Sequence, residues 1–276
     1  MRADPAPTVN GSSGRLTATA LGAGRLVWLL VSRIGGLFLL LQTYTAFRKR
    51  YFLRPAEVAF DHARDLLALE RTLHLDVELS LQRWALHHPW AVDAGNLYYR
   101  QLKPILYGST VLALLLAPVA FRRIGRAVII ATLLAWPWYA LYPLAPPRLM
   151  APYGFPFVDT LAAAGPIVTP PGGGANPYAA MPSMHIGWST LVALWLAAAL
   201  PWWRIGSVLG VLHLTMMSYA VVVTGNHYVL DVAAGLVVAG IALGLARLHP
   251  LSLIRERRRS VPFPRLDRRG PGPGPW

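Results

Sequence analysis

The sequence predicts an all-α membrane protein: a bundle of six transmembrane helices with an amphipathic segment on the membrane surface between the first and second spans. Of the 276 residues, 55% are hydrophobic and only 14% are charged, whereas soluble domains carry about 25% charged residues. The mean hydropathy is +0.42. Several apolar runs approach the roughly 20 residues that cross a bilayer. These observations together favour an integral membrane protein.

One membrane domain is expected between two tails. Residues 1–24 have no apolar core, which predicts a disordered cytoplasmic tail rather than a cleaved signal peptide. The membrane domain covers 25–248, and a basic, disordered tail rich in Gly and Pro covers 249–276. The expected spans lie at about 26–47, 94–121, 127–144, 182–200, 205–223 and 228–248.

Residues 56–86 form the amphipathic segment between the first two spans. Acidic and basic residues alternate there with leucines at helical spacing, a pattern typical of helices that lie on a membrane. A second unusual stretch, 145–181, is rich in Pro and Gly. A loop of that length is uncommon in a compact domain unless it has a function.

The distribution of basic residues predicts the orientation. Both tails, the expected basic turn 122–126 and Arg204 fall on one side of the six spans, which the positive-inside rule assigns to the cytoplasm. The basic run 48–54 falls on the other side and opposes this topology. We therefore expect a multi-pass plasma membrane protein with both termini cytoplasmic. The loop 145–181 and the turn 224–227 then face outward.

The clearest candidate for chemistry is the stretch TGNHYVLD at 224–231. Asp231 is the one acidic residue expected inside a span, and a carboxylate there indicates a functional site. His227 precedes it by four residues, so the two side chains share one face of a helix. A histidine oriented and made more basic by a carboxylate can attack phosphorus and form a phosphohistidine. His227 is therefore a candidate nucleophile and Asp231 its orienting partner.

Two further motifs fall on the same expected face. APPRL at 145–149 contains Arg148, whose guanidinium matches phosphate oxygens. MPSMHIG at 181–187 places Pro182 where a helix begins, so Ser183 and His185 lie at a helix N-terminus that favours an anion. His185 can protonate a leaving oxygen. Phosphoryl transfer by this set requires no metal and no cofactor.

These residues resemble the type 2 phosphatidic acid phosphatase superfamily of membrane enzymes. That family has a Lys and an Arg-Pro, then Pro-Ser-x-His, then an Arg and His-x-x-x-Asp. The second motif is matched in full by Pro182, Ser183 and His185, and the end of the third is matched by His227 and Asp231. The resemblance is strongest over 95–248. It implies a six-span fold with His227 as nucleophile, His185 as general acid and Asp231 as orienter.

Two family cations are absent. Position 141, where the family Lys would stand, is Leu, and position 221, where the third-motif Arg would stand, is Val. The Pro-Pro-Arg-Leu form at 146–149 and the His-Tyr pair in Asn226-His227-Tyr228 are more similar to one branch, the inositol phosphorylceramide synthases and their bacterial relatives, which transfer a phosphorylated headgroup between lipids and alcohols. A diester carries less charge and requires fewer cations. Arg100 and Lys103 are candidate substitutes, because they too are expected on the outer side.

The sequence thus predicts a lipid-phosphate phosphotransferase or phosphatase. Its partners would be a membrane lipid phosphate and, for transfer, an alcohol acceptor such as inositol or another lipid. Two alternatives remain: a metal-dependent membrane hydrolase that uses His185, His227 and Asp231 as ligands, and a non-enzymatic lipid transporter. Nucleic acid is not an expected partner despite the net charge of +14, because nothing couples the basic tails to the membrane core. The Arg-, Ala-, Pro- and Gly-rich composition indicates a GC-rich bacterial genome.

Overall fold

The computed structural model describes residues 24, 27–28, 31–32, 34–44, 46, 56–164, 176–200 and 202–246. The expected tails lie outside the described residues, apart from Gly24.

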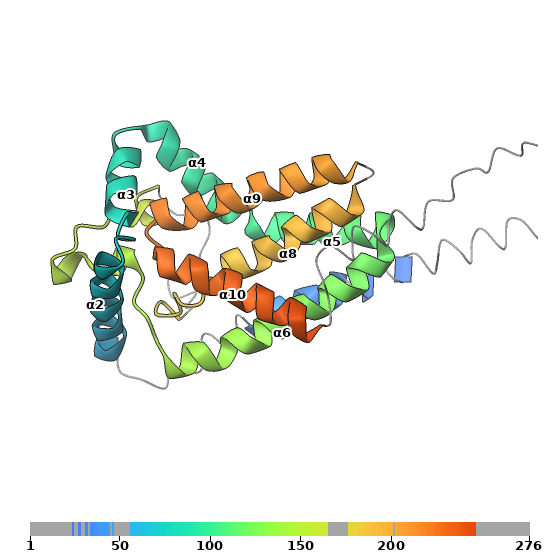
Figure 1. Cartoon of the computed structure of the whole chain (residues 1–276), viewed down its shortest axis with the longest axis horizontal. Helices are drawn as coiled ribbons and strands as arrows, with labels where there is room; N and C mark the ends of the chain where they lie inside the picture. The colour runs from blue at the N-terminus through green and yellow to red at the C-terminus, as the bar shows by residue number, and fades with distance from the viewer. Residues whose placement is uncertain are drawn as a thin grey trace, which may run out of the picture.

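The described parts are helical (Figure 1), with one isolated β-bridge between Leu144 and Ala179. After a short helix at Ile34–Tyr44 come α2 (Ala56–Thr72), α3 (Glu78–Leu86), α4 (Pro89–Arg100), α5 (Leu102–Leu116), α6 (Pro118–Leu141), the 3-10 turns η1 (Pro147–Leu149) and η2 (Ala151–Tyr153), α7 (Thr160–Ala163), α8 (Met184–Ala199), α9 (Trp203–Val223) and α10 (Val229–Leu245).

Helix α8 forms the centre of a bundle. It packs against α5, α6, α9 and α10, and most of its side chains are buried because the helix is apolar on every face. Its neighbours approach closely at glycines. A Cβ on Gly206 of α9 would lie 2.4 Å from the Leu196 carbonyl oxygen, and one on Gly235 of α10 would lie 2.4 Å from the Ser183 carbonyl oxygen. The start of α8 is therefore held tightly against α10.

Two helices of the bundle, α6 and α9, are long and apolar enough to cross a membrane. The helices at 34–44, 102–116, 184–199 and 229–245 are apolar but shorter. Large apolar side chains cover the outer surface of the bundle, for example Leu133 (48% exposed), Val211 (63%) and Val237 (59%). Exposed apolar surface spread over several helices is typical of protein that faces lipid or a partner.

The predicted end of the second span and the predicted basic turn after it were wrong. The chain leaves the helical conformation at Ala117 (φ −144°, ψ 62°), and α6 begins at Pro118. A proline disfavours helical backbone in the residue before it and suits the first turn of a new helix. The basic residues Arg122–Arg126 consequently lie inside α6 and not in a turn.

Helices α2 and α3 form as expected, and Leu66 and Leu67 of α2 are buried, but one acidic residue lies on the same buried face. Ala59, Ala63 and Leu66 point inward together with Glu70, whereas Leu69 is half exposed. Both helices lie across the end of the bundle at which α10 begins (Figure 1). They therefore contribute to the polar end of the molecule described next.

Candidate active site

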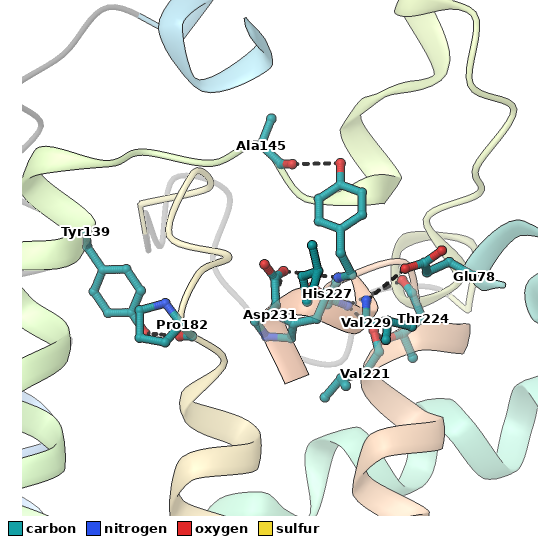
Figure 2. A network of polar contacts seen from close by, with 12 residues as sticks. Glu78, Tyr139, Ala145, Pro182, Val221, Thr224, His227, Val229 and Asp231 are labelled. Carbon is teal, nitrogen blue, oxygen red and sulfur yellow. Dashed lines mark hydrogen bonds and ion pairs between the residues drawn. The ribbon is translucent and has the colours of Figure 1, made fainter. Parts of the chain in front are cut away.

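The three sequence motifs meet at one end of the bundle, and tyrosines and backbone bonds join them (Figure 2). The Tyr228 hydroxyl donates to the Ala145 carbonyl at 3.0 Å, which links the third motif to the first. The Tyr139 hydroxyl donates to the Pro182 carbonyl at 2.7 Å, which links α6 to the second. The three motifs are thus held together by buried hydrogen bonds.

A tight turn between α9 and α10 positions His227. The Val221 carbonyl accepts from the backbone N–H groups of both Asn226 and His227. Gly225 has a left-handed φ of +68°, and its carbonyl accepts from the Arg148 N–H at 2.8 Å. A Cβ at Gly225 would lie 3.1 Å from the Arg148 Cβ. The turn therefore requires glycine and fixes the spacing between Arg148 and His227.

The expected pair of His227 and Asp231 forms. His227 Nδ1 lies 3.3 Å from Asp231 Oδ2, so Nδ1–H can donate to the carboxylate. The same Oδ2 accepts from the Tyr228 N–H at 3.0 Å. Asp231 is fully buried, and Oδ1 has no hydrogen-bond partner among the described residues. The carboxylate thus fixes the ring orientation of His227 and directs Nε2 away from α10.

His185 lies beside His227. Its ring centroid is 5.6 Å from that of His227, and the planes of the two rings are inclined by 59°. The opposite neighbour of His185 is Tyr99 of α4, stacked on it at 4.3 Å. Because His185 is the second residue of α8, the turn that begins this helix also determines its distance from His227.

Both histidines line one cavity of about 520 Å³, here called the histidine cavity. Arg100, Lys103 and Arg148 line it as well, so all three expected cations meet the two histidines. Its remaining wall consists of apolar, aromatic and amide side chains or small residues: Leu41, Tyr44, Tyr99, Leu102, Tyr139, Pro146, Asn176, Pro177, Ala179, Ala180, Met184, Trp188 and Asn226. The cavity can accommodate an anionic group beside an apolar one.

Arg148 also has an acidic neighbour. Its Nε lies 3.2 Å from Asp159 Oδ2, and both side chains are partly exposed, at 20% and 32%. Asp159 in turn accepts from the Ala162 N–H as the N-cap of α7. A segment of the Pro- and Gly-rich loop thus contributes to the orientation of the guanidinium.

The expectation that Ser183 binds phosphate does not agree with its placement. Its side chain is fully buried and does not line the histidine cavity, and its Oγ has no hydrogen-bond partner among the described residues. Its backbone N–H donates to the Asp231 carbonyl at 3.1 Å. Ser183 therefore joins the start of α8 to α10, while His185 faces the cavity.

The positions of the two absent family cations differ in surroundings. Leu141 is 63% exposed, and Val221 is fully buried beneath the turn before α10. Neither residue lines the histidine cavity, whereas Arg100 and Lys103 do. The cations that line the histidine cavity therefore come from the end of α4, the start of α5 and η1.

Two buried acids were missed by sequence reasoning. Glu78 Oε1 accepts from the Val229 N–H at 2.7 Å, and Glu70 Oε1 accepts from the Leu230 N–H at 2.8 Å. Burial, with a contribution from the neighbouring Glu78 carboxyl, raises the pKa of Glu70 to about 9. The available signal was the position of Glu70 on the stripe formed by Ala59, Ala63 and Leu66, where a stable helix would place an apolar residue.

A second cavity, of about 690 Å³, lies toward the other ends of α6 and α8 and is here called the arginine cavity. Arg122, Arg123 and Arg126 line it among largely apolar residues, and the described lining includes no histidine or carboxylate. Within the described ranges, no three His, Asp or Glu side chains are grouped as metal ligands would be. The histidine cavity is thus the better candidate for an active site, although it is smaller.

Comparison with known proteins supports this assignment. The model of the PAP2 superfamily matches residues 64–245, well over half of the chain. No curated protein and no solved structure matches the chain. The match begins inside α2, so α2 and α3 belong to the family region, which was expected to begin near residue 95. The chain therefore belongs to the PAP2 superfamily, whose members are phosphatase-type enzymes that act on phosphate esters.

Proposed function

We propose that this protein is an integral membrane phosphotransferase or phosphatase that acts on a lipid phosphate through a phosphohistidine on His227. One observation carries the proposal: His227, oriented by Asp231, shares a cavity with His185 and with three cationic side chains. The family match supports chemistry on a phosphate ester, and the apolar outer surface of the bundle supports a membrane location.

The first step is transfer of the phosphoryl group to the protein. His227 Nε2 attacks phosphorus while the bond between phosphorus and the leaving oxygen breaks, and His185 donates a proton to that oxygen. Arg100, Lys103 and Arg148 offset the charge on the remaining phosphate oxygens. As the bond forms, the imidazole of His227 becomes positively charged, and Asp231 stabilises that charge through Nδ1–H.

The second step releases the phosphoryl group. Water or an alcohol attacks phosphorus, the bond between phosphorus and Nε2 breaks, and His185 accepts the proton of the attacking hydroxyl. His227 returns to its neutral form and His185 to its protonated form, so the cycle is balanced. Water as the acceptor gives hydrolysis, and an alcohol such as inositol gives transfer.

Three features favour a lipid as substrate. Leu41, Leu102 and Trp188 give the histidine cavity an apolar wall next to its cations. Large exposed apolar side chains cover the neighbouring helices. The proposed topology has six spans, both termini in the cytoplasm and the histidine cavity facing outward at the plasma membrane, with α2 and α3 at the membrane surface. In this arrangement the headgroup reaches His227 while the acyl or prenyl chain stays in the bilayer.

The absence of family cations at positions 141 and 221 supports transfer from a diester. A bridging phosphate diester carries one negative charge, whereas a terminal phosphate carries up to two, so fewer cations suffice. Similarity to the inositol phosphorylceramide synthase branch extends this proposal. Arg100 and Lys103 supply positive charge in the cavity in place of the two missing side chains.

The test uses the purified full chain in lipid nanodiscs. Lipid phosphates, diphosphates and phosphodiesters are supplied with and without labelled inositol, and released phosphate and new lipid species are measured. We expect turnover that survives EDTA, is lost in His227→Ala and is retained in His87→Ala, an exposed histidine outside the cavity. Full turnover by His227→Ala would overturn the mechanism. Loss of turnover in EDTA would instead favour a metal-dependent hydrolase.

A further inference from the structure

The first turn of α10 bonds to two carboxyl groups that the proposed reaction does not use, in addition to Asp231. Three successive backbone N–H groups donate to three different acids: Tyr228 to Asp231, Val229 to Glu78 and Leu230 to Glu70. Figure 2 shows the bond from Val229 to Glu78 beside His227 and Asp231. Glu70 and Glu78 are respectively 0% and 1% exposed. Neither lines the histidine cavity, so neither can touch a substrate there.

Three buried carboxylates at one helix end would repel one another strongly. The groups that act electrostatically on Glu70 are Glu78 from α3 and Asp231 from α10, both acidic, and the adjacent Tyr228 is a neutral phenol. Glu70 Oε2 is buried and has no hydrogen-bond partner among the described residues. The carboxyls of Glu70 and Glu78 accept from adjacent N–H groups, those of Leu230 and Val229, which brings the two acids together at the start of α10. A proton on Glu70 removes one of the three negative charges and so reduces the repulsion. It also gives Glu70 Oε2 a hydrogen that can be donated to Glu78.

We propose that Glu70 and Glu78 share one proton and act together as positioning residues that hold the first turn of α10, and with it His227 and Asp231, against the rest of the site. The inference rests on the proposed function for its catalytic consequence. The N–H groups that α10 presents at its start are occupied by protein carboxyls. By contrast, the start of α8 carries Met184 and His185 on the cavity wall. The substrate phosphate consequently meets the start of α8 and not that of α10.

This arrangement explains why α2 and α3 belong to the catalytic unit. Glu78 of α3 precedes its partner Val229 by 151 residues, and Glu70 of α2 precedes its partner Leu230 by 160 residues. The two acids nevertheless accept from the first two N–H groups of α10. Gln82 of α3 reinforces the same end, since its Nε2 donates to the Val223 carbonyl at 2.8 Å, the last residue of α9. The turn that carries His227 is therefore supported on both sides by side chains from α3.

The experiment compares Glu70→Gln with Glu70→Ala in the full chain in nanodiscs. Glutamine has the shape of the protonated acid and can donate to Glu78, so we expect kcat within about threefold of wild type. Alanine leaves the Leu230 N–H without its acceptor and allows α10 to shift. A displacement of the nucleophile by about 1 Å can cost 100-fold in rate, so we expect kcat to fall by about 10- to 100-fold with KM nearly unchanged. Glu57→Ala, an exposed acid on the same helix, is the matched control.

A second readout needs no substrate. Diethyl pyrocarbonate modifies neutral imidazoles, and mass spectrometry gives the rate at each histidine. We expect Glu70→Ala to change the rate at His227 by at least about threefold and Glu70→Gln to restore it, while the rate at the exposed His87 stays constant. This readout separates the inference from the proposed function, since it reports on His227 even if no lipid phosphate is turned over.

Each outcome decides the inference. Rescue of His227 reactivity by glutamine but not by alanine supports it, with or without turnover. Equal behaviour of Glu70→Ala and wild type would overturn the positioning role. Loss of kcat in Glu70→Gln to the level of Glu70→Ala would overturn the shared proton, because it would require an ionised Glu70. If Glu70→Ala does not fold, Glu78→Gln is compared with wild type instead. Its amide can donate to Glu70 in place of the shared proton, so an unchanged His227 rate and kcat support the proposal, whereas a loss in either contradicts it.

Discussion

The two cavities of the bundle resemble each other in composition but differ in chemistry. Each is lined by three cationic side chains next to apolar residues: Arg100, Lys103 and Arg148 in one, and Arg122, Arg123 and Arg126 in the other. Arg126 and Tyr139 lie 13 residues apart on α6, which places the two cavities about 20 Å apart along the helix. Both arrangements can attract a lipid phosphate. Only the histidine cavity, however, holds an imidazole paired with a buried carboxylate.

The difference shows that cations next to an apolar wall are insufficient to define this active site. The arginine cavity is the larger of the two, at about 690 Å³ against 520 Å³. What distinguishes the histidine cavity is the number of chain segments that meet there. The turn 224–227 connects α9 to α10 and bonds to η1, and side chains of α2 and α3 bond to the helix ends on either side of it. Such convergence keeps a nucleophile in place, whereas an anchoring site for a headgroup does not require it.

The largest difference between the cavities should appear when the nucleophile is removed. We expect His227→Ala to lower kcat on the order of 10⁴-fold or more, because the imidazole that Asp231 orients forms the proposed intermediate. Arg123→Ala in the arginine cavity should leave kcat unchanged. Steady-state kinetics with both variants, each checked for folding by circular dichroism, tests the expectation. A loss of kcat in Arg123→Ala as large as in His227→Ala would contradict the distinction between the cavities.

Removal of the proposed general acid should have a smaller effect that depends on the substrate. We expect His185→Ala to lower kcat by about 10²- to 10⁴-fold for an alkyl phosphate, whose leaving oxygen needs a proton. The effect should be much smaller for an aryl phosphate such as p-nitrophenyl phosphate, since its leaving oxygen is stable as an anion. Comparison of the two substrates with the same preparation provides the measurement. Equal losses in the pre-steady-state rate at which the two leaving groups are released would mean that His185 does not act as the acid, because that rate excludes the second step, in which His185 accepts a proton.

Removal of a cation should affect one cavity and not the other. Arg100→Ala should lower kcat/KM by about 10- to 100-fold, because a hydrogen bond to a charged group contributes roughly 1.5–3 kcal/mol. Arg126→Ala, the matched change in the arginine cavity, should stay within about twofold of wild type. If the two variants behave alike, the cations of the histidine cavity do not bind the transferring phosphate.

A pair of glycines allows the same comparison for stability. Gly225→Ala should destabilise the protein by about 1–3 kcal/mol, because its φ of +68° is unfavourable for alanine and its Cβ would press on Arg148. Gly125 lies inside α6 and lines the arginine cavity, and a Cβ there would have no atom within 4 Å. Gly125→Ala should therefore leave the stability of the protein unchanged or increase it. Thermal unfolding in detergent measures both. A stable Gly225→Ala would show that the turn before His227 is not strained in this way.

A dependence of stability on pH is expected as well. The folded state keeps a proton on Glu70 up to its raised pKa of about 9, whereas the unfolded chain loses it near 4.5. The folded state therefore binds more protons between these values, and stability falls as pH rises from about 5 to 9. Glu70→Gln should reduce this fall, while Glu57→Gln should not. Melting temperatures across that pH range test the prediction, and parallel curves for wild type and Glu70→Gln would contradict it.

Sequence reasoning predicted most of the geometry of the candidate site because its signals are local. His227 and Asp231 are one helical turn apart, and Pro182 marks the start of the helix that carries His185, so their pairing and placement follow from short spacings. The motifs were expected on one membrane face, and the structure brings Arg148 to the same cavity. The family match confirms the superfamily that the motifs indicated.

The missed features depend on contacts between distant segments. The capping of α10 by Glu70 joins residues 160 apart, and no local pattern shows which N–H group a buried acid will meet. The contact between Arg148 and Asp159 likewise depends on how the loop folds. The turn predicted at 122–126 was wrong for a different reason. We expected the charged residues to end a span, but the chain leaves the helix before Pro118 and a new helix then includes these residues.

The central claim is a covalent phosphoryl group on His227, and direct detection tests it most clearly. The protein would be incubated briefly with a lipid labelled with ³²P at its phosphate, quenched in alkali and digested for mass spectrometry. The account predicts an acid-labile, alkali-stable label on the peptide that contains His227, present in His87→Ala and absent from His227→Ala. A label on another residue, or turnover in His227→Ala without any labelled protein, would contradict it.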